Sequence, residues 1–561
     1  MTSVTEPVLR RERASARSSA RWRIGRLVQG LVLLTCVLLF LGAGLYEAWA
    51  DAPTFDEPVY VAAGLQAVLH HDLVINDEHP PLAKVIAALP VLLVRPVVPA
   101  NTAPNANGER AYSAKFLRAQ EQAGTLRAVT FASRLATLLE ALGLAALLFL
   151  LGRRLFGSMA GTQAASLWLL SPFVLGLSHL DAVDPAFAVA VVGWSWAMLR
   201  WTDRPTTRRA VVVGLLSAAA ALTDVTGMLI AGIGVVVMLA YGWSRLPRRG
   251  AGQCLVVAAV CWAAIWLVYI LLDPRVVTDP TIVLPSPYLQ GISYLAHQDT
   301  QPGPGYLLGV AWTGGRWWYW PGSLLVKTVP TTLLVLVLGP IGWRTVDRST
   351  RRRALAVLAA PAVVLLAFDM TTPRDIGLRY LLPVIALWLV AASSVVRYGR
   401  KVGPGLGVLA ILVAGAFTVA SLPASLAWAA PPFGPAYRSV TNSDVDWGQG
   451  LYQLQRWSRG KDPWVAYFGP RGLGTSPVSG AKPLLGTAPG RVTGWVAVSA
   501  TDLTSAERRS LRWLRAYCPV GDLGGSILLY RFREPPSGSV GPTRPAARCP
   551  PADRWSVRVS R

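Results

Sequence analysis

The charged segment Asp51-Ala-Pro-Thr-Phe-Asp-Glu-Pro-Val-Tyr60 directly follows an apolar run that extends from residue 27 to residue 49. Acidic residues and histidines continue from there to Lys84 in a chain that is otherwise strongly apolar. Charged groups that gather just outside a membrane span face water or a polar cavity, and they often mark a functional site. The alternative is an ordinary solvated loop after a first span. The order of the residues in this stretch favours a functional site, as shown below.

Composition places the chain among polytopic α-helical membrane proteins. Hydrophobic residues make up 53% of the 561 residues and charged residues only 15%, and the mean hydropathy is +0.41. Apolar runs of about 20 residues, the length that crosses a hydrocarbon core roughly 30 Å thick, recur along the chain. We therefore expect about 11 spans, at 27–49, 131–151, 161–179, 185–201, 209–222, 226–242, 252–272, 323–342, 354–369, 379–396 and 404–427.

Basic residues predict the orientation of these spans. Arginine and lysine crowd the N-terminal tail and alternate loops, whereas the short loops at 180–184 and 222–226 contain neither. By the positive-inside rule the N terminus is cytoplasmic and, with an odd number of spans, the region after Trp428 is external. Topology, anionic lipid and the basic tail then account for much of the formal net charge of +24, so we expect a cell (plasma) membrane protein with no nucleic-acid partner.

This topology divides the chain into a basic cytoplasmic tail, a transmembrane module, a small external α/β domain and a Pro/Arg-rich tail that we expect to be disordered. The four ranges are 1–26, 27–428, 429–533 and 534–561. Two long external loops belong to the transmembrane module, at 51–130 and 273–322.

The external domain is predicted from short alternating runs in a polar segment. The predicted elements are three strands and one helix, at 464–468, 494–499, 526–532 and 506–517. Cys518 and Cys549 also fall outside the spans and could pair in an oxidising compartment. No Cys/His spacing indicates structural zinc.

Several motifs carry a resemblance to a known family. Asp56-Glu57 is followed by His79-Pro-Pro-Leu-Ala-Lys84. Farther along come Arg316-Trp-Trp-Tyr-Trp-Pro321 with Lys327-Thr-Val-Pro330, then Gly377-Leu-Arg-Tyr-Leu-Leu-Pro383, and finally Asn442-Ser-Asp-Val-Asp-Trp-Gly-Gln449. In these motifs the chain resembles the protein O-mannosyltransferase family and its bacterial relatives, the phospholipid carrier-dependent glycosyltransferases of the C-type membrane glycosyltransferase superfamily. The resemblance implies the C-type glycosyltransferase fold.

The chain also departs from that family. Asp444 stands where the bacterial relatives have asparagine, and the large domain that eukaryotic protein mannosyltransferases insert between the seventh and eighth spans is missing. The missing domain weakens the case for proteins as acceptors. The role of residues 442–451 stays open, and we expect Asp446 and Trp447 to be surface contacts.

The implied reaction transfers a sugar, mannose or a related hexose, from a polyprenyl phosphate to an acceptor hydroxyl by a single inverting displacement. A hydroxyl is a poor nucleophile near neutral pH, so a carboxylate must take its proton while cations stabilise the departing phosphate. We expect Asp56 to be the base and Glu57 its catalytic neighbour. Acceptor binding or loop support is expected from His79, Lys84, His179 and Asp184. Donor phosphate binding is expected from Lys327, Arg374, Arg379 and Tyr380, since guanidinium groups donate paired hydrogen bonds to phosphate.

Other interpretations stay open for the donor site and for the function as a whole. A lipid-linked donor fits because the charged loops face outward and the sequence has no Gly-rich nucleotide-binding loop. The scheme requires no metal or other cofactor, but Asp56, Glu57 and His79 could instead ligate a divalent ion.

The acceptor could be a protein, a glycan or a lipid. The rival class is a transporter or flippase of lipid-linked sugars, although inverted repeats typical of transporters are not visible.

Overall fold

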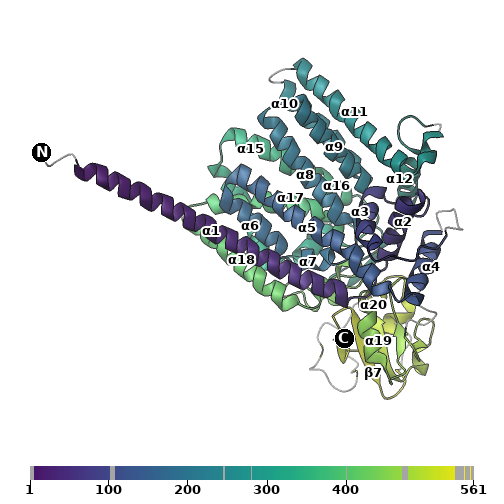
Figure 1. The fold of residues 1–561 in the computed structure, drawn as a ribbon. Coiled ribbons are helices and arrows are strands. Elements are labelled where there is room, and N and C mark those ends of the chain that lie inside the picture. The colour runs from purple at the N-terminus through teal and green to yellow at the C-terminus, as the bar shows by residue number, and fades with distance from the viewer. Residues whose placement is uncertain are drawn as a thin grey trace.

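The computed structural model describes residues 5–100, 108–243, 247–278, 281–399, 401–470 and 478–536, together with Cys549 and Ser556. A long first helix, α1 (Thr5–Ala50), runs along the outside of a helical bundle and extends well beyond it toward the N terminus (Figure 1). The second half of α1 packs against helices α5, α6 and α7. A small domain containing the C-terminal strands lies at the end of the bundle where α1 ends (Figure 1).

The segment 51–130, predicted to be an external loop, and the bundle are almost entirely helical. The loop forms α2 (Glu57–His70), α3 (Pro81–Leu92) and α4 (Gly108–Gln122). The first part of the bundle comprises α5 (Leu126–Phe156), α6 (Ser158–Leu169), α7 (Pro172–Ser178), α8 (Val183–Asp203), α9 (Thr207–Thr223), α10 (Gly227–Trp243) and α11 (Pro247–Leu272).

The segment 273–322, predicted to be the second external loop, contains a short 3₁₀ helix, one longer helix and a β-hairpin: η1 (Pro274–Thr278), α12 (Ser286–Asp299), β1 (Pro304–Leu307) and β2 (Val310–Thr313). The remaining helices of the bundle are α13 (Tyr319–Lys327), α14 (Pro330–Gly342), η2 (Trp343–Thr345), α15 (Arg348–Ala354), the π-helical turn η3 (Leu355–Ala359), α16 (Ala360–Asp369), η4 (Leu378–Leu381), α17 (Leu382–Ala392), η5 (Ser393–Arg397) and α18 (Val402–Ser421).

Prolines break two of the segments for which the sequence predicts a continuous span. The predicted span at 161–179 consists of α6 and α7, which meet at an angle of 61°. Ser171 caps α7 through a hydrogen bond from the Val174 amide, and Pro172 occupies its first turn. The predicted span at 323–342 is likewise divided before Pro330. Proline has no amide hydrogen and restricts the residue before it, so helices end at these points.

Helices occupy all eleven segments for which the sequence predicts a span, but they differ in length. Five helices of the described chain are long and apolar enough to cross a membrane, or six if α6 and α7 together count as one broken span. The chain is therefore an integral membrane protein with several apolar helices. The total of about 11 spans stays a prediction.

The outer faces of α1 and α18 are apolar. Leu31, Leu34 and Leu38 of α1 are each more than half exposed, as are Leu412 and Val419 of α18. The leucines of α1 recur every three to four residues, the spacing that places side chains on one face of a helix. Contiguous apolar surface of this kind is suited to contact with lipid.

The C-terminal part contains a five-stranded sheet in the order β4-β3-β5-β7-β6. The strands are β3 (Trp464–Ala466), β4 (Lys482–Pro483), β5 (Gly494–Ser499), β6 (Gly521–Leu523) and β7 (Ile527–Phe532). β4, β3 and β5 are parallel, whereas β5, β7 and β6 are antiparallel. The domain also contains α19 (Leu451–Ser458) and α20 (Ala500–Thr504), and short 3₁₀ turns lead into it at η6 (Ser425–Ala427), η7 (Ala436–Arg438) and η8 (Asn442–Asp444). The helix predicted at 506–517 is a 3₁₀ helix, η10 (Arg509–Ala516), and another 3₁₀ turn, η9 (Pro489–Arg491), precedes β5.

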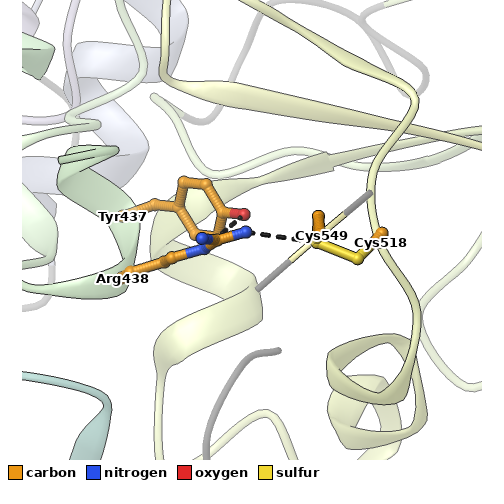
Figure 2. Close-up of a disulfide and its surroundings, with 4 residues drawn as sticks. All are labelled: Tyr437, Arg438, Cys518 and Cys549. Carbon is orange, nitrogen blue, oxygen red and sulfur yellow. Dashed lines mark hydrogen bonds between the residues drawn. A yellow bond between two sulfur atoms is a disulfide. The ribbon is translucent and has the colours of Figure 1, made fainter. Parts of the chain in front are cut away.

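A disulfide ties the C-terminal tail to this domain. Cys518 and Cys549 are bonded, with Cα atoms 5.6 Å apart, and Arg438 donates a hydrogen bond to the Cys549 sulfur (Figure 2). Ser556 donates its amide hydrogen to the Arg531 carbonyl of β7. The predicted disordered tail is thus anchored at these two described positions, and nearly all of its other residues lie outside the described ranges.

Candidate active site

Asp56 lies at the start of α2, in the short segment that joins α1 to α2. Its carboxylate accepts a hydrogen bond from Arg110 on α4 at 2.8 Å and forms an ion pair with Arg379 at 3.6 Å. Burial opposes ionisation of this carboxyl, but the charges of Arg110 and Arg379 outweigh burial and lower the pKa of Asp56. Asp56 is therefore held as a carboxylate.

Arg379 joins three parts of the chain that are distant in sequence. It precedes α17, in the 3₁₀ turn η4, and its guanidinium forms ion pairs with Asp56 and with Asp184 at the start of α8, both at 3.6 Å. It also donates a hydrogen bond to the Tyr380 hydroxyl at 3.2 Å. The Nε of Arg379 and the Oδ2 of Asp184 are buried and have no hydrogen-bond partner in the described part of the chain. Buried polar atoms of this kind are available to a ligand.

A cavity of about 310 Å³ lies beside this ion-pair cluster. Of the predicted site residues, the cavity is lined by His79, Asp184, Arg374 and Tyr380. Its other polar side chains are Glu78, Asp224, Thr226, Gln298, Asp299, Asp369 and Thr372, and its apolar side chains include Phe187, Ile292, Leu295, Trp320, Leu365 and Phe368. A concave site with an apolar wall and a few convergent polar groups is typical of a binding pocket.

Asp56 itself does not line this cavity, whereas Asp184 does. Burial raises the pKa of Asp184, although Arg379 opposes the rise. A general base must reach the proton that it removes, and a raised pKa makes a carboxylate a stronger base. Asp184, expected to support the acceptor, therefore competes with Asp56 for the catalytic role.

Glu57 is not among the residues that line the cavity. Its buried ion pair with Arg134 links α1, α2 and α5. Arg134 on α5 donates one hydrogen bond to each Glu57 oxygen, at 2.7 and 2.8 Å. The same carboxylate accepts hydrogen bonds from the backbone amides of Thr54 and Asp181, both at 2.7 Å. Glu57 and Arg134 are at most 2% exposed. Glu57 thus fixes the loop that carries Asp56 rather than facing a ligand.

The two lysines of the motifs also bind the protein itself. Lys84 donates hydrogen bonds to the Asn76 carbonyl, the Asn76 side chain and the His79 carbonyl, and burial lowers its pKa to about 8. Gly64 on α2 lies so close to the Lys84 carbonyl that a Cβ would come within 2.1 Å of it, which explains the small residue there. Lys327 donates to the carbonyls of Leu426, Trp428 and Asp444. These contacts use all three ammonium hydrogens of each lysine.

The other predicted residues divide in the same way. His179 contacts Asp51 at 3.1 Å and Glu47 at 3.2 Å in a buried cluster away from the cavity. Arg374 donates two hydrogen bonds to Gln298 of α12, and both residues line the cavity.

The structure adds one residue to the predicted site and gives the positions of three others. Arg110 lies in a helix that reads as exposed and polar, and only its contact with Asp56 shows its importance. Asp224 caps its own turn through Thr226, as its position between two predicted spans indicates, and it also lines the cavity. The expectation that Asp446 and Trp447 are surface contacts is wrong, because they are 0% and 1% exposed. Their segment is buried between the C-terminal domain and the bundle.

No group of three or more histidine, cysteine or acidic side chains within the described ranges is arranged to hold a metal ion.

Comparison with known proteins gives distant structural likenesses. No protein-family model and no curated protein matches the chain. The structure is similar to that of ArnT from Cupriavidus metallidurans bound to undecaprenyl phosphate, with 14% identity, a TM-score of 0.45, and 72% of this chain and 67% of that chain covered. It is also similar to AglB, the oligosaccharyltransferase of Archaeoglobus fulgidus, in complex with an inhibitory peptide and a dolichol-phosphate, with 12% identity, a TM-score of 0.45, and 88% and 73% covered.

Proposed function

We propose that this chain is a glycosyltransferase that moves a sugar from a polyprenyl phosphate to an acceptor hydroxyl at the external face of the membrane. The main support is the position of Arg379, whose buried guanidinium lies between the carboxylates of Asp56 and Asp184 beside the cavity. A transfer of this kind needs a carboxylate for the acceptor and a cation for the phosphate, and this cluster supplies both.

The roles follow from the contacts. Asp56 is the proposed base, kept ionised by Arg110 and Arg379, and Asp184 is the alternative base because it reaches the cavity. Arg374 and Arg379 are the proposed cations for the donor phosphate, since a guanidinium keeps its charge next to an apolar wall. Attack by the hydroxyl forms the new bond to the anomeric carbon as the bond to the phosphate oxygen breaks. The configuration at the anomeric carbon is inverted, and the electron pair of the broken bond leaves with the polyprenyl phosphate.

The apolar wall of the cavity suits the first isoprene units of the donor. Phe187, Leu365 and Phe368 belong to helices of the bundle, and we propose that the polyprenyl chain leaves the cavity along them toward lipid. Undecaprenyl phosphate and dolichol-phosphate, named with the two similar structures, are carriers of this class. Mannose or a related hexose is the proposed sugar, and a protein or a cell-envelope glycan the proposed acceptor.

The proposed orientation places the N terminus in the cytoplasm and the C-terminal domain outside. The disulfide between Cys518 and Cys549 supports it, because disulfides persist in oxidising compartments. A reporter that is active only in the cytoplasm should therefore be silent when it is fused after Trp457.

Purified protein in liposomes, with labelled polyprenyl-phosphate hexoses and extracts of candidate acceptors, tests the function. The expected result is label in an acceptor, and the labelled product then identifies both sugar and acceptor. If the protein only carries label across the bilayer, it is a transporter and the proposal fails.

A further inference from the structure

Residues 442–450, here called the bracket loop, open the C-terminal domain and reach the ion-pair cluster. Asp444 and Asp446 are 0% exposed and Trp447 is 1% exposed. Buried polar groups of this kind are stable only where they form hydrogen bonds within the protein. The partners of this loop lie on both sides of the candidate active site.

On one side the bracket loop binds the segment that carries Asp56. The amide of Phe55 donates to the Trp447 carbonyl at 2.8 Å, and the amide of Ala52 donates to the Gln449 carbonyl at 2.9 Å. The Gln449 side chain stiffens the loop, because it accepts from the Trp447 amide at 2.8 Å and donates to the Val445 carbonyl at 2.9 Å. These bonds fix the residue directly before Asp56.

On the other side the same loop binds the segment that carries Arg379. The amide of Leu378 donates to the Asp444 carboxylate at 2.9 Å, and the Ser443 hydroxyl donates to the Ile376 carbonyl at 2.9 Å. Gly377 lies between them with φ +154°, and a Cβ there would come within 2.0 Å of the Ser443 oxygen. The contact is therefore too close for any other residue at 377 without movement. These bonds fix the residue directly before Arg379.

The bracket loop is in turn anchored in the C-terminal domain. The Asp446 carboxylate accepts from the amides of Gly448 at 3.2 Å and Thr501 at 3.1 Å. The Thr501 hydroxyl donates to the Asp446 carbonyl at 2.6 Å. The spacing between the Asp56 segment and the Arg379 segment is thus set from outside the bundle.

Trp447 connects the loop to the cluster itself. Its ring lies 4.3 Å from the central carbon of the Arg379 guanidinium, and Tyr380 contacts the same guanidinium from 4.9 Å. A cation over an indole ring is attracted to it, and the attraction is strongest where water is excluded. The ring thus contacts the guanidinium, while the Nε of Arg379 has no hydrogen-bond partner in the described part of the chain.

We infer that Trp447 is a positioning residue, supplied by the C-terminal domain, that fixes the Arg379 guanidinium between Asp56 and Asp184. This inference rests on the proposed function for its catalytic consequence. The C-terminal domain is then part of the active site and not a separate binding module, and the bracket loop sets the distance between the base and the cation for the phosphate.

The test compares Trp447→Ala and Trp447→Phe with Trp457→Ala, all as full-length protein in detergent. Trp457 also stacks with a cation, Lys461 at 5.4 Å, but lies in α19 away from the cluster. We expect Trp447→Ala to lower kcat/KM for the labelled donor at least about tenfold, Trp447→Phe to lower it less, and Trp457→Ala to leave it unchanged. We also expect the acid limb of the pH profile to move to higher pH in Trp447→Ala, because Asp56 loses the nearby charge of Arg379 while Arg110 and His79 remain.

A second measurement does not depend on activity. Phenylglyoxal modifies accessible arginines, and mass spectrometry identifies which ones. Arg379, 6% exposed in the folded chain, should be protected in wild type, in Trp457→Ala and largely in Trp447→Phe, but modified in Trp447→Ala. If wild type transfers no sugar while this labelling pattern holds, the proposed function fails and the positioning role stands. Protection of Arg379 and an unchanged acid limb in a folded Trp447→Ala would overturn the inference. If Trp447→Ala does not fold, the inference is overturned when Trp447→Phe shows wild-type kinetics and full protection of Arg379.

Discussion

Two buried arginines flank the Asp56-Glu57 pair, and they are used in opposite ways. Arg134 donates five hydrogen bonds, two to Glu57 and three to the carbonyls of Ala48, Asp51 and Ala52. Five is the full capacity of a guanidinium group, so nothing is left for a ligand. Arg379 instead has its carboxylates at 3.6 Å and an Nε without a hydrogen-bond partner among the described residues.

The difference separates structural cations from cations that can bind a ligand. Lys84 and Lys327 belong with Arg134, because each donates three hydrogen bonds to groups of the protein. Arg379 belongs with Asp184, whose Oδ2 is also left without a hydrogen bond. Incomplete hydrogen bonding in a buried polar cluster costs stability, and such clusters are kept where a ligand completes them.

The comparison predicts the largest loss of activity from removal of a carboxylate next to Arg379. A general base contributes roughly 10²–10⁴-fold to the rate, so Asp56→Asn should lower kcat by that factor while the protein still folds. Asp184→Asn should lower it less if Asp184 only orients Arg379. Steady-state transfer from labelled donor measures both.

The opposite order, with Asp184→Asn abolishing transfer and Asp56→Asn nearly active, would move the base to Asp184. If both variants transferred sugar at the wild-type rate, neither carboxylate would take part in the reaction. Donor binding, measured separately, serves as the control for correct folding of each variant.

Glu57 should behave differently from its neighbour. Removing one partner of a buried ion pair costs about 3–5 kcal/mol, so Glu57→Gln should lower the free energy of unfolding by up to that amount. Thermal unfolding in detergent measures the loss. The donor KM of the protein that stays folded should not change. A changed donor KM with an unchanged melting temperature would mean that Glu57 acts on the donor and is not a structural group.

Arg379→Lys should raise the donor KM about tenfold, since lysine keeps the charge but loses the planar pair of donors. Lys327→Met is the matched variant in the structural group. It should lower stability and leave the donor KM unchanged. A rise in KM in the Lys327 variant alone would reverse the two assignments.

Sequence patterns predicted the elements of this molecule better than its contacts. The apolar runs and the short alternating runs correspond to helices and strands, because periodicity depends on local chain geometry. The motifs located Asp56, Asp184 and Arg379, which the fold brings together. The use made of Glu57 and Lys327 was not visible, because a motif gives residue types and not the number of hydrogen bonds that each one makes. The position of Trp447 depends on docking of the C-terminal domain, which leaves no periodic signal.

The smallest predicted effect concerns Asp77, which lies near the buried Lys84 and outside the cavity lining. Burial raises the pKa of Asp77 to about 6 from 3.8, although Lys84 opposes the rise. The folded protein then binds more protons than the unfolded chain between these two pKa values. The stability that Asp77 contributes is therefore fully present below pH 3.8 and is lost as the pH rises through about 6. Because Asp77 is partly exposed, solvent screening limits the loss to the order of 1 kcal/mol.

Asp77→Asn should remove this pH dependence, since asparagine does not titrate. The measurement is the difference in unfolding free energy between wild type and the variant at pH 4 and pH 6.5, where other titrating groups contribute equally to both proteins and cancel. Wild type should lose about 1 kcal/mol relative to the variant over this range. Lys84 gives a contrast at higher pH, because burial lowers its pKa from 10.5 to about 8 and stability should therefore rise with pH between those values. A difference between wild type and Asp77→Asn that stays constant from pH 4 to pH 6.5 would contradict this prediction. It would mean that Asp77 is as well solvated in the folded protein as in the unfolded chain, and that the fold around Lys84 does not exclude water from it.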